Sequence, residues 1–188
     1  MSNVIIIDHY DSFVFNILRY VLELNKNARV ISCNIMKAKD IMQLSPSHLI
    51  FSPGPCGPDD TGVSSELMRL ALGKIPILGI CLGSLVLYQL LGGEIEPALM
   101  PRHGESILLE HSNKYILQGL SKYAEVGLYH SLMMGGILPE KVEVIARCKK
   151  NQLMAIKHVD FDAYGLQFHP ESILTLQGKM ILKNFLLL

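Results

Sequence analysis

The sequence predicts an α/β protein with a doubly wound, mostly parallel sheet, helices on both faces and antiparallel strands added in its second half. Three observations indicate this flavodoxin-like class. Short apolar runs without polar alternation are typical of strands buried on both faces. Segments with helical spacing separate these runs in the first half, which predicts right-handed crossovers between parallel strands. After Gly93 the predicted strands follow one another without helices, which indicates antiparallel pairing.

Strands and helices alternate through the first half of the chain. The run Asn3–Asp8 is apolar up to its final acid and predicts a central strand. Residues 12–24 carry apolar side chains at helical spacing, and Asp11 or Ser12 can cap the first turn. The remaining strands are expected at 28–33, 48–52 and 75–80, and the remaining helices at 39–44, 64–72 and 82–91.

The second half is richer in strands. Antiparallel strands are expected at 105–109, 124–129, 142–147 and 154–158. Residues 165–168 are expected to return to the parallel sheet, and 175–186 to form the last helix. Because the chain shows no internal repeat, low-complexity tract or linker, we expect residues 1–188 to form one domain.

Composition argues against several classes of function. Lys+Arg and Asp+Glu both number 17, so no basic surface for nucleic acid or an anionic membrane is expected. The N-terminus lacks the basic region of a signal peptide. The four cysteines form no C-x-x-C pair. We therefore expect a cytoplasmic protein with free thiols, no metal site and no cofactor.

Residues 75–93 contain no charged side chain, and their length approaches that of a membrane-spanning helix. Pro76 and several glycines interrupt the segment, and Ser84 and Gln89 are polar. A buried strand, a turn and a buried helix therefore explain this segment better than a membrane span.

Cys81 stands between a buried strand and a helix, in the run Gly79-Ile80-Cys81-Leu82-Gly83. Glycines at 79 and 83 remove side chains where the strand and the helix must come close. The helix N-terminus favours a thiolate, which is the nucleophilic form of cysteine. The segment alone fits a buried core cysteine equally well. A matching base and acid downstream favour a nucleophile.

That base and acid lie in the run Phe168-His169-Pro170-Glu171. A residue before proline is biased to an extended backbone, in which residues two apart project to the same side. Glu171 can therefore reach the His169 ring and fix its tautomer. Alone, the run fits a surface loop with an acid, but its position after an apolar strand favours a catalytic role.

The loop Ser52-Pro53-Gly54-Pro55-Cys56 follows the third predicted strand. Ligands of open α/β sheets bind at the carboxyl ends of strands, where this loop and Cys81 both lie. Prolines lack an N–H, so Gly54 is the only backbone donor between Ser52 and Cys56. Gly54 and the N–H of Leu82 could form an oxyanion hole. An ordinary turn is the alternative, and Cys56 has no recognisable base beside it.

Five motifs in this order resemble the class I glutamine amidotransferases with a Cys-His-Glu triad, in particular the small glutaminase subunits of anthranilate and aminodeoxychorismate synthases. The resemblance covers essentially the whole chain. The motifs are Asp8-His9-Tyr10-Asp11-Ser12-Phe13, Ser52-Pro53-Gly54-Pro55-Cys56, Gly79-Ile80-Cys81-Leu82-Gly83, Tyr129-His130-Ser131-Leu132 and Phe168-His169-Pro170-Glu171-Ser172-Ile173.

The resemblance implies that Cys81 attacks the carboxamide of L-glutamine, that His169 protonates the departing ammonia, and that a thioester is then hydrolysed. Glu171 completes the triad. The implied substrate-binding residues are Gly54, Pro55, Cys56, Leu82, Leu85, Ser131 and Leu132. The implied partner is a chorismate-binding synthase subunit, expected as a separate chain because this sequence ends soon after the triad motif. The segment Asp11-Ser12-Phe13 lies near that partner or supports the site, or simply caps the first helix.

One departure from the resemblance concerns substrate binding. The family usually continues Cys-Leu-Gly with His-Gln, whereas this chain has Ser84 and Leu85. Position 85 lies one helical turn beyond Cys81 on the same face. In the family the glutamine at this position contacts the substrate glutamine, and a leucine side chain cannot make that hydrogen bond. Its loss is expected to cost roughly 1–3 kcal/mol, or roughly 10–100-fold in affinity for glutamine. Gln89 lies about 12 Å along the axis from Cys81, too far to substitute simply. Ser84 is smaller than histidine and is expected to leave a gap.

We therefore expect a complete triad with weakened glutamine recognition. Two other functions stay open: a related cysteine hydrolase acting on another amide, and a structural or regulatory subunit that has lost glutamine binding. The sequence does not separate the anthranilate pathway from the aminodeoxychorismate pathway.

Overall fold

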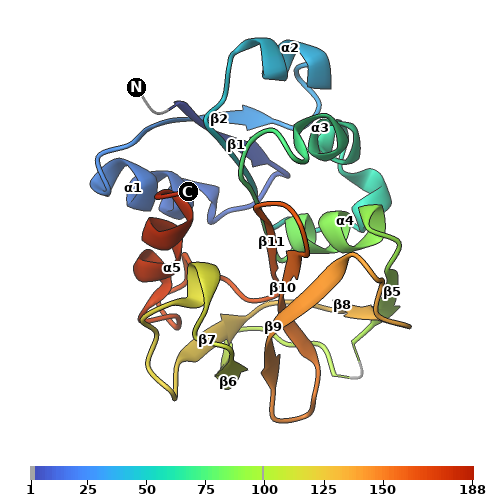
Figure 1. Ribbon diagram of the computed structural model, residues 1–188, viewed down its shortest axis with the longest axis vertical. Coiled ribbons are helices and arrows are strands. Elements are labelled where there is room, and N and C mark those ends of the chain that lie inside the picture. Colours follow the sequence, from blue (N-terminus) through green and yellow to red (C-terminus); the bar gives the residue numbers. More distant parts are fainter. Residues whose placement is uncertain (1–2, 99) are drawn as a thin grey trace.

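A computed structural model describes residues 3–98 and 100–188 of the chain. Its largest feature is a sheet with the strand order β2-β1-β3-β4-β11-β10-β9-β6-β7 (Figure 1). These strands are β1 (Asn3–Asp8), β2 (Asn27–Ser32), β3 (His48–Phe51), β4 (Ile77–Ile80), β6 (Glu105–His111), β7 (Glu125–Leu128), β9 (Val142–Cys148), β10 (Leu153–His158) and β11 (Ala163–Leu166). The first five strands in this order are parallel, and the last four are added antiparallel. This arrangement confirms the predicted fold class.

Helices cover both faces of the parallel half (Figure 1). They are α1 (Val14–Glu23), α2 (Ala38–Gln43), α3 (Ser64–Ala71), α4 (Leu82–Leu90) and α5 (Gly178–Phe185), with short 3₁₀ turns η1 (Pro58–Asp60) and η2 (Tyr115–Leu117). Alternate residues of β1 enter different cores. Val4 and Ile6 pack with α1 and α5, whereas Ile5 and Ile7 pack with α2, α3 and α4. Burial on both faces explains why this strand is a continuous apolar run.

A second, two-stranded sheet was not predicted from the sequence. In it β5 (Glu94–Pro97) pairs antiparallel with β8 (Leu132–Gly135). The Tyr88 hydroxyl of α4 donates a hydrogen bond of 2.9 Å to the Gly135 carbonyl, which links this sheet to the main fold.

Three predicted boundaries were wrong near the carboxyl ends of the parallel strands. The last parallel strand is β11 and ends at Leu166, because the chain then bends toward β7, where the His169 N–H bonds the Gly127 carbonyl at 3.1 Å. The last helix begins at Gly178 rather than 175, because Thr175 uses its hydroxyl to bond the His169 carbonyl at 2.6 Å. Helix α1 begins after Phe13 without a side-chain cap; the Asp11 carboxylate accepts the Phe13 N–H instead.

Over residues 3–98 and 100–188, the helices are all too short or too polar to cross a membrane. The uncharged segment 75–93 is divided between β4, the Cys81 turn and α4, as expected.

Candidate active site

Cys81 occupies the sharp turn between β4 and α4. It is the N-cap residue of α4, with φ 49° and ψ −103°, a left-handed backbone conformation that non-glycine residues seldom adopt. Backbone hydrogen bonds hold the turn: the Cys81 N–H donates to the Leu166 carbonyl at 2.7 Å, and the N–H groups of Ser84 and Leu85 donate to the Cys81 carbonyl at 3.0 and 3.1 Å. The turn therefore places the thiol at the N-terminus of a helix.

Glycines 79 and 83 are required by close backbone approach, as the sequence predicted. A Cβ at Gly79 would lie 2.3 Å from the Gly83 carbonyl oxygen, and one at Gly83 would lie 2.4 Å from the Phe51 carbonyl oxygen. Strand β4, helix α4 and strand β3 thus meet at distances that exclude any side chain at these two positions.

His169 and Glu171 form a buried pair. Nδ1 of His169 lies 2.7 Å from Oε1 of Glu171, and the two side chains are 4% and 1% exposed. The carboxylate accepts a hydrogen bond from the Nδ1–H group, which leaves Nε2 as the reactive nitrogen. Nε2 is buried and has no aligned hydrogen-bond partner among the described residues.

The pKa of His169 is raised. Burial lowers the pKa, but the interactions with the Cys81 and Glu171 side chains outweigh burial and raise it to about 10. His169 therefore holds a proton at neutral pH and can give it to a leaving group.

A cavity of about 210 Å³ opens in front of Cys81. Its walls include every substrate-binding residue predicted from the sequence. The lining residues are Gly54, Pro55, Cys56, Cys81, Leu82, Leu85, Tyr129, His130, Ser131 and Leu132. Cys81 is 6% exposed, so its side chain reaches the cavity while most of it stays covered.

Gly54 is packed against His9 at the base of this cavity. A Cβ at Gly54 would lie 2.6 Å from the His9 Cβ and 2.8 Å from Cδ2 of Leu82. The His9 imidazole is itself fixed at both nitrogens: Nδ1 lies 2.8 Å from the Ser52 carbonyl oxygen and Nε2 2.7 Å from Oγ of Ser64. This buried histidine ties β1, the Ser52 loop and α3 together.

The residues that depart from the resemblance lie in different places. Leu85 lines the cavity with a side chain that is only 3% exposed. Ser84 is fully buried outside the cavity lining, where its hydroxyl donates to the Cys81 carbonyl at 2.7 Å. Gln89 donates to Oδ1 of Asp59 at 3.0 Å and does not line the cavity. Only Leu85 therefore changes the surface that a ligand would touch.

Sequence reasoning gave no individual role to Tyr129 or His130. Both line the cavity, and Tyr129 packs its ring on His169. Their place in the motif Tyr129-His130-Ser131-Leu132 was the sequence feature that could have indicated a role for them. Asp11, expected near the site or at the first helix, accepts the Phe13 N–H through its carboxylate at 2.8 Å. Burial raises the pKa of Asp11, this hydrogen bond lowers it, and the negative charge of Glu171 raises it.

Comparisons with known proteins identify the family of the chain. Residues 5–188 match the family model "Glutamine amidotransferase class-I". The chain is 41% identical over 184 residues to "Aminodeoxychorismate/anthranilate synthase component 2" of Bacillus subtilis, covering 97% of this chain and 95% of that protein. It is 40% identical to "Aminodeoxychorismate synthase component 2" of Klebsiella aerogenes, with 97% and 98% covered.

The fold is also similar to that of a glutamine amidotransferase from Thermotoga maritima, whose crystal structure is known. The TM-score is 0.81 at 18% identity, and the match covers 98% of this chain and 96% of that one. Because the family model spans nearly the whole chain, this protein belongs to the class I glutamine amidotransferase family.

Proposed function

We propose that this chain hydrolyses the carboxamide of L-glutamine through Cys81, His169 and Glu171, and supplies the ammonia to a chorismate-aminating synthase subunit. One observation carries the proposal: Tyr129 lines the cavity together with Cys81 and packs its ring against His169, whose Nδ1 lies 2.7 Å from Glu171. This neighbourhood supports the assignment of Cys81 as nucleophile, His169 as base and Glu171 as orienting acid.

The first half of the reaction forms a thioester. The Cys81 thiolate attacks the γ-carbonyl carbon of glutamine, and the negative charge moves to the carbonyl oxygen. The N–H groups of Gly54 and Leu82 are the proposed donors to that oxygen, since both residues line the cavity. The C–N bond then breaks while His169 gives its proton to the nitrogen, so that ammonia leaves.

The second half restores the enzyme. His169, now neutral at Nε2, takes a proton from water, and the water oxygen attacks the thioester carbon. The C–S bond breaks and releases glutamic acid, whose γ-carboxyl proton passes to the solvent or to the released ammonia to give glutamate, with Cys81 again a thiolate beside a protonated His169. Glutamine and water are consumed, and glutamate and ammonia are formed. Glu171 holds the imidazole through both proton transfers.

The remaining wall residues are proposed to position the substrate. Ser131 and Leu132 offer backbone groups to the α-amino and α-carboxylate groups of glutamine, and Pro55 and Cys56 close the cavity beside Gly54. Cys56 is a wall residue in this scheme and takes no part in the chemistry.

A separate synthase chain is part of the proposal because the relatives are named as component 2 of their synthases. Ammonia released into water is protonated and loses its nucleophilicity, so it must pass directly to an acceptor site. The relatives' names include both anthranilate and aminodeoxychorismate synthases, and the proposed partner is the chorismate-binding component of either.

Covalent trapping tests the chemistry directly. A diazo-ketone analogue of glutamine, added in the presence of the synthase partner, is expected to attach to Cys81, and mass spectrometry of the digested protein locates the adduct. Cys81→Ser should abolish both the adduct and glutamine-dependent amination, while amination from added ammonium salt persists. Cys56→Ser removes the other thiol of the cavity wall and should retain the adduct on Cys81.

Leu85 favours a second candidate function, a non-catalytic subunit that retains the fold and supports the synthase. That function predicts a different outcome: no adduct on Cys81, together with intact ammonia-dependent amination when the two chains are mixed. An adduct on Cys81 without any glutamine-dependent amination would instead point to a related cysteine hydrolase.

A further inference from the structure

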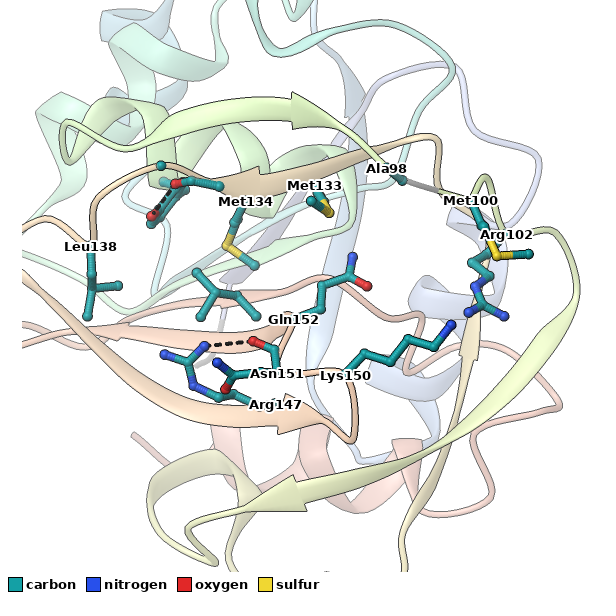
Figure 2. Close-up of a pocket in the computed structure, with 14 residues that line it drawn as sticks. Ala98, Met100, Arg102, Met133, Met134, Leu138, Arg147, Lys150, Asn151 and Gln152 are labelled. Atoms are coloured by element: carbon teal, nitrogen blue, oxygen red, sulfur yellow. Dashed lines mark hydrogen bonds between the residues drawn. The ribbon is translucent and has the colours of Figure 1, made fainter.

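We propose that the chain has a second ligand site, for a small organic carboxylate with an apolar ring, in a cavity of about 500 Å³ between β8 and the turn that joins β9 to β10 (Figure 2). Cavities of about 300–1,000 Å³ are typical of small-molecule sites. The inference does not depend on the proposed glutaminase chemistry, because Cys81, His169 and Glu171 all lie outside the lining of this cavity.

The second cavity shares a stretch of chain with the first. Leu132 lines the cavity in front of Cys81, whereas Met133 and Met134 line the second one. The Ala98 N–H donates to the Ser131 carbonyl at 2.8 Å, and the Arg102 N–H donates to the His130 carbonyl at 2.9 Å. The segment is therefore hydrogen-bonded to residues that border the second site.

The charge of the lining selects an anion. Arg102, Arg147 and Lys150 line the cavity, and the described residues of its lining include no carboxylate. Arg102 is paired with Glu105, and Arg147 donates to the Asn151 carbonyl at 2.8 Å. Lys150 is exposed and takes part in no salt bridge within residues 3–98 and 100–188. Lys150 is thus the cation that remains available to a ligand.

Gln152 supplies a donor to the same cavity. Its Nε2 is buried and has no hydrogen-bond partner among the residues that the structure describes. A buried donor without an acceptor is costly, and a carboxylate oxygen would remove that cost. In Figure 2 the Lys150 and Arg102 side chains extend toward the same end of the cavity, and the Gln152 amide points into its middle.

The surroundings of Tyr88, which also lines the cavity, are unsuited to an anion. Burial and the charges of Glu94 and Glu96 raise the pKa of Tyr88, whereas the charge of Arg147 lowers it. A carboxylate is therefore expected to lie beside Lys150 and Gln152, with the rest of the ligand extending away from them.

The apolar walls call for more than an inorganic anion. Methionine and leucine side chains form much of the lining: Met100, Met133, Met134, Leu138 and Leu153. Methionine adapts its shape and packs well on aromatic rings. A neighbouring cavity of about 250 Å³ shares Arg102, Lys150 and Gln152 and adds Ile107, Leu108 and Leu128. A ring can thus be buried on either side of the same cationic end.

The test is a titration of the full chain with benzoate, followed through the ¹³C-methyl resonances of its methionines. Benzoate is expected to shift Met133 and Met134, and benzamide, which has the same ring without the charge, should bind at least about tenfold more weakly. Inorganic phosphate should leave these methyl resonances in place. Phosphate binding without benzoate binding would overturn the apolar part of the proposal.

Lys150→Gln should weaken benzoate binding about tenfold. Lys39→Gln, which removes an exposed lysine of α2, should leave it unchanged. The Lys150 side chain is exposed, so the variant should fold with an unchanged Tm. The site would be refuted by equal binding of benzoate and benzamide, by wild-type affinity in Lys150→Gln, or by no methyl shift at about 10 mM benzoate. Failure of the glutaminase assay would not affect these outcomes.

Discussion

The ring of Tyr129 stands edge-on to the imidazole of His169, with centroids 4.9 Å apart and ring planes at 68°. The Tyr129 hydroxyl lies 3.1 Å from Oγ of Ser172, and its ring also contacts Phe13, with centroids 6.1 Å apart. His169 is thus held from two directions, by the hydrogen bond to Glu171 and by an aromatic ring that is itself anchored.

Tyr129→Ala should lower kcat of glutamine hydrolysis by roughly 10–100-fold, because a small misplacement of the base is costly to proton transfer. Tyr129→Phe keeps the ring and should stay within about threefold of wild type. Tyr123→Ala removes a tyrosine that is 69% exposed and should change nothing. A Tyr129→Ala enzyme with normal kcat would show that Glu171 alone orients His169.

Leu85→Gln should lower the KM for glutamine by roughly 10–100-fold, because it adds a hydrogen-bonding group to the cavity wall. The kcat with ammonium salt as nitrogen source should stay the same. Gln89→Leu is the matched control, since Gln89 lies on the same helix but bonds Asp59 outside the cavity. An unchanged glutamine KM in Leu85→Gln would contradict weakened recognition.

Gly54→Ala should destabilise the protein by roughly 1–3 kcal/mol and reduce glutamine hydrolysis, because the new Cβ would overlap His9 and Leu82 at the cavity floor. Gly57→Ala offers a control in the same loop, since a Cβ there meets no atom within 4 Å. Urea unfolding measures the stability of both variants. Equal stability and activity of the two would mean that the loop moves freely away from His9.

Stability should fall as the pH drops below about 6.5. Burial lowers the pKa of His9, His48, His130 and His158 from the ordinary value of 6.5, so the unfolded chain binds more protons than the folded one in this range. Their contribution is present above about pH 6.5 and is lost as the pH falls through their folded pKa values. Each additional proton that the unfolded chain binds changes the free energy of unfolding by at most about 1.4 kcal/mol per pH unit.

His48→Phe should flatten this acid slope by removing one of the four imidazoles. His48 lies 5.3 Å from the Phe185 ring, and its Nε2 is buried without a partner among the described residues. Urea unfolding between about pH 5 and pH 6.5 measures the slope. The contribution of His169 to the free energy of unfolding is constant in this range. Its folded-state pKa is raised, so this contribution is lost only at higher pH. Phe185→Leu should lower stability without changing the slope.

The parallel half of the fold was predictable because its strands are buried on both faces. Ile5 and Ile7 enter one core while Val4 and Ile6 enter the other. Burial on both faces requires an uninterrupted apolar run, and such a run can be recognised in the sequence. The strands β5 and β8 gave no such signal. They are short, and their pairing joins residues such as Ile95 and Met134 that lie far apart in the chain.

Some features of the candidate site could also be predicted from the sequence, and others could not. The neighbours of Cys81 could be anticipated because local chain geometry requires glycine at 79 and 83. The contact of Tyr129 with His169 could not, since it depends on how a loop after β7 packs against a loop after β11. The requirement for glycine at 178 has a similar origin, because a Cβ there would collide with the Pro170 carbonyl, a contact made only after folding.

The parallel pairing of β4 with β11 has a consequence for biosynthesis. Leu166 pairs with Ile80, although a long stretch of chain separates the two residues. At roughly 5–20 residues per second, a ribosome needs about 4–17 seconds to make the stretch between them. During that interval Cys81 has been synthesised and His169 has not. Under the proposed mechanism, a nascent chain is therefore inactive until β11 has inserted beside β4.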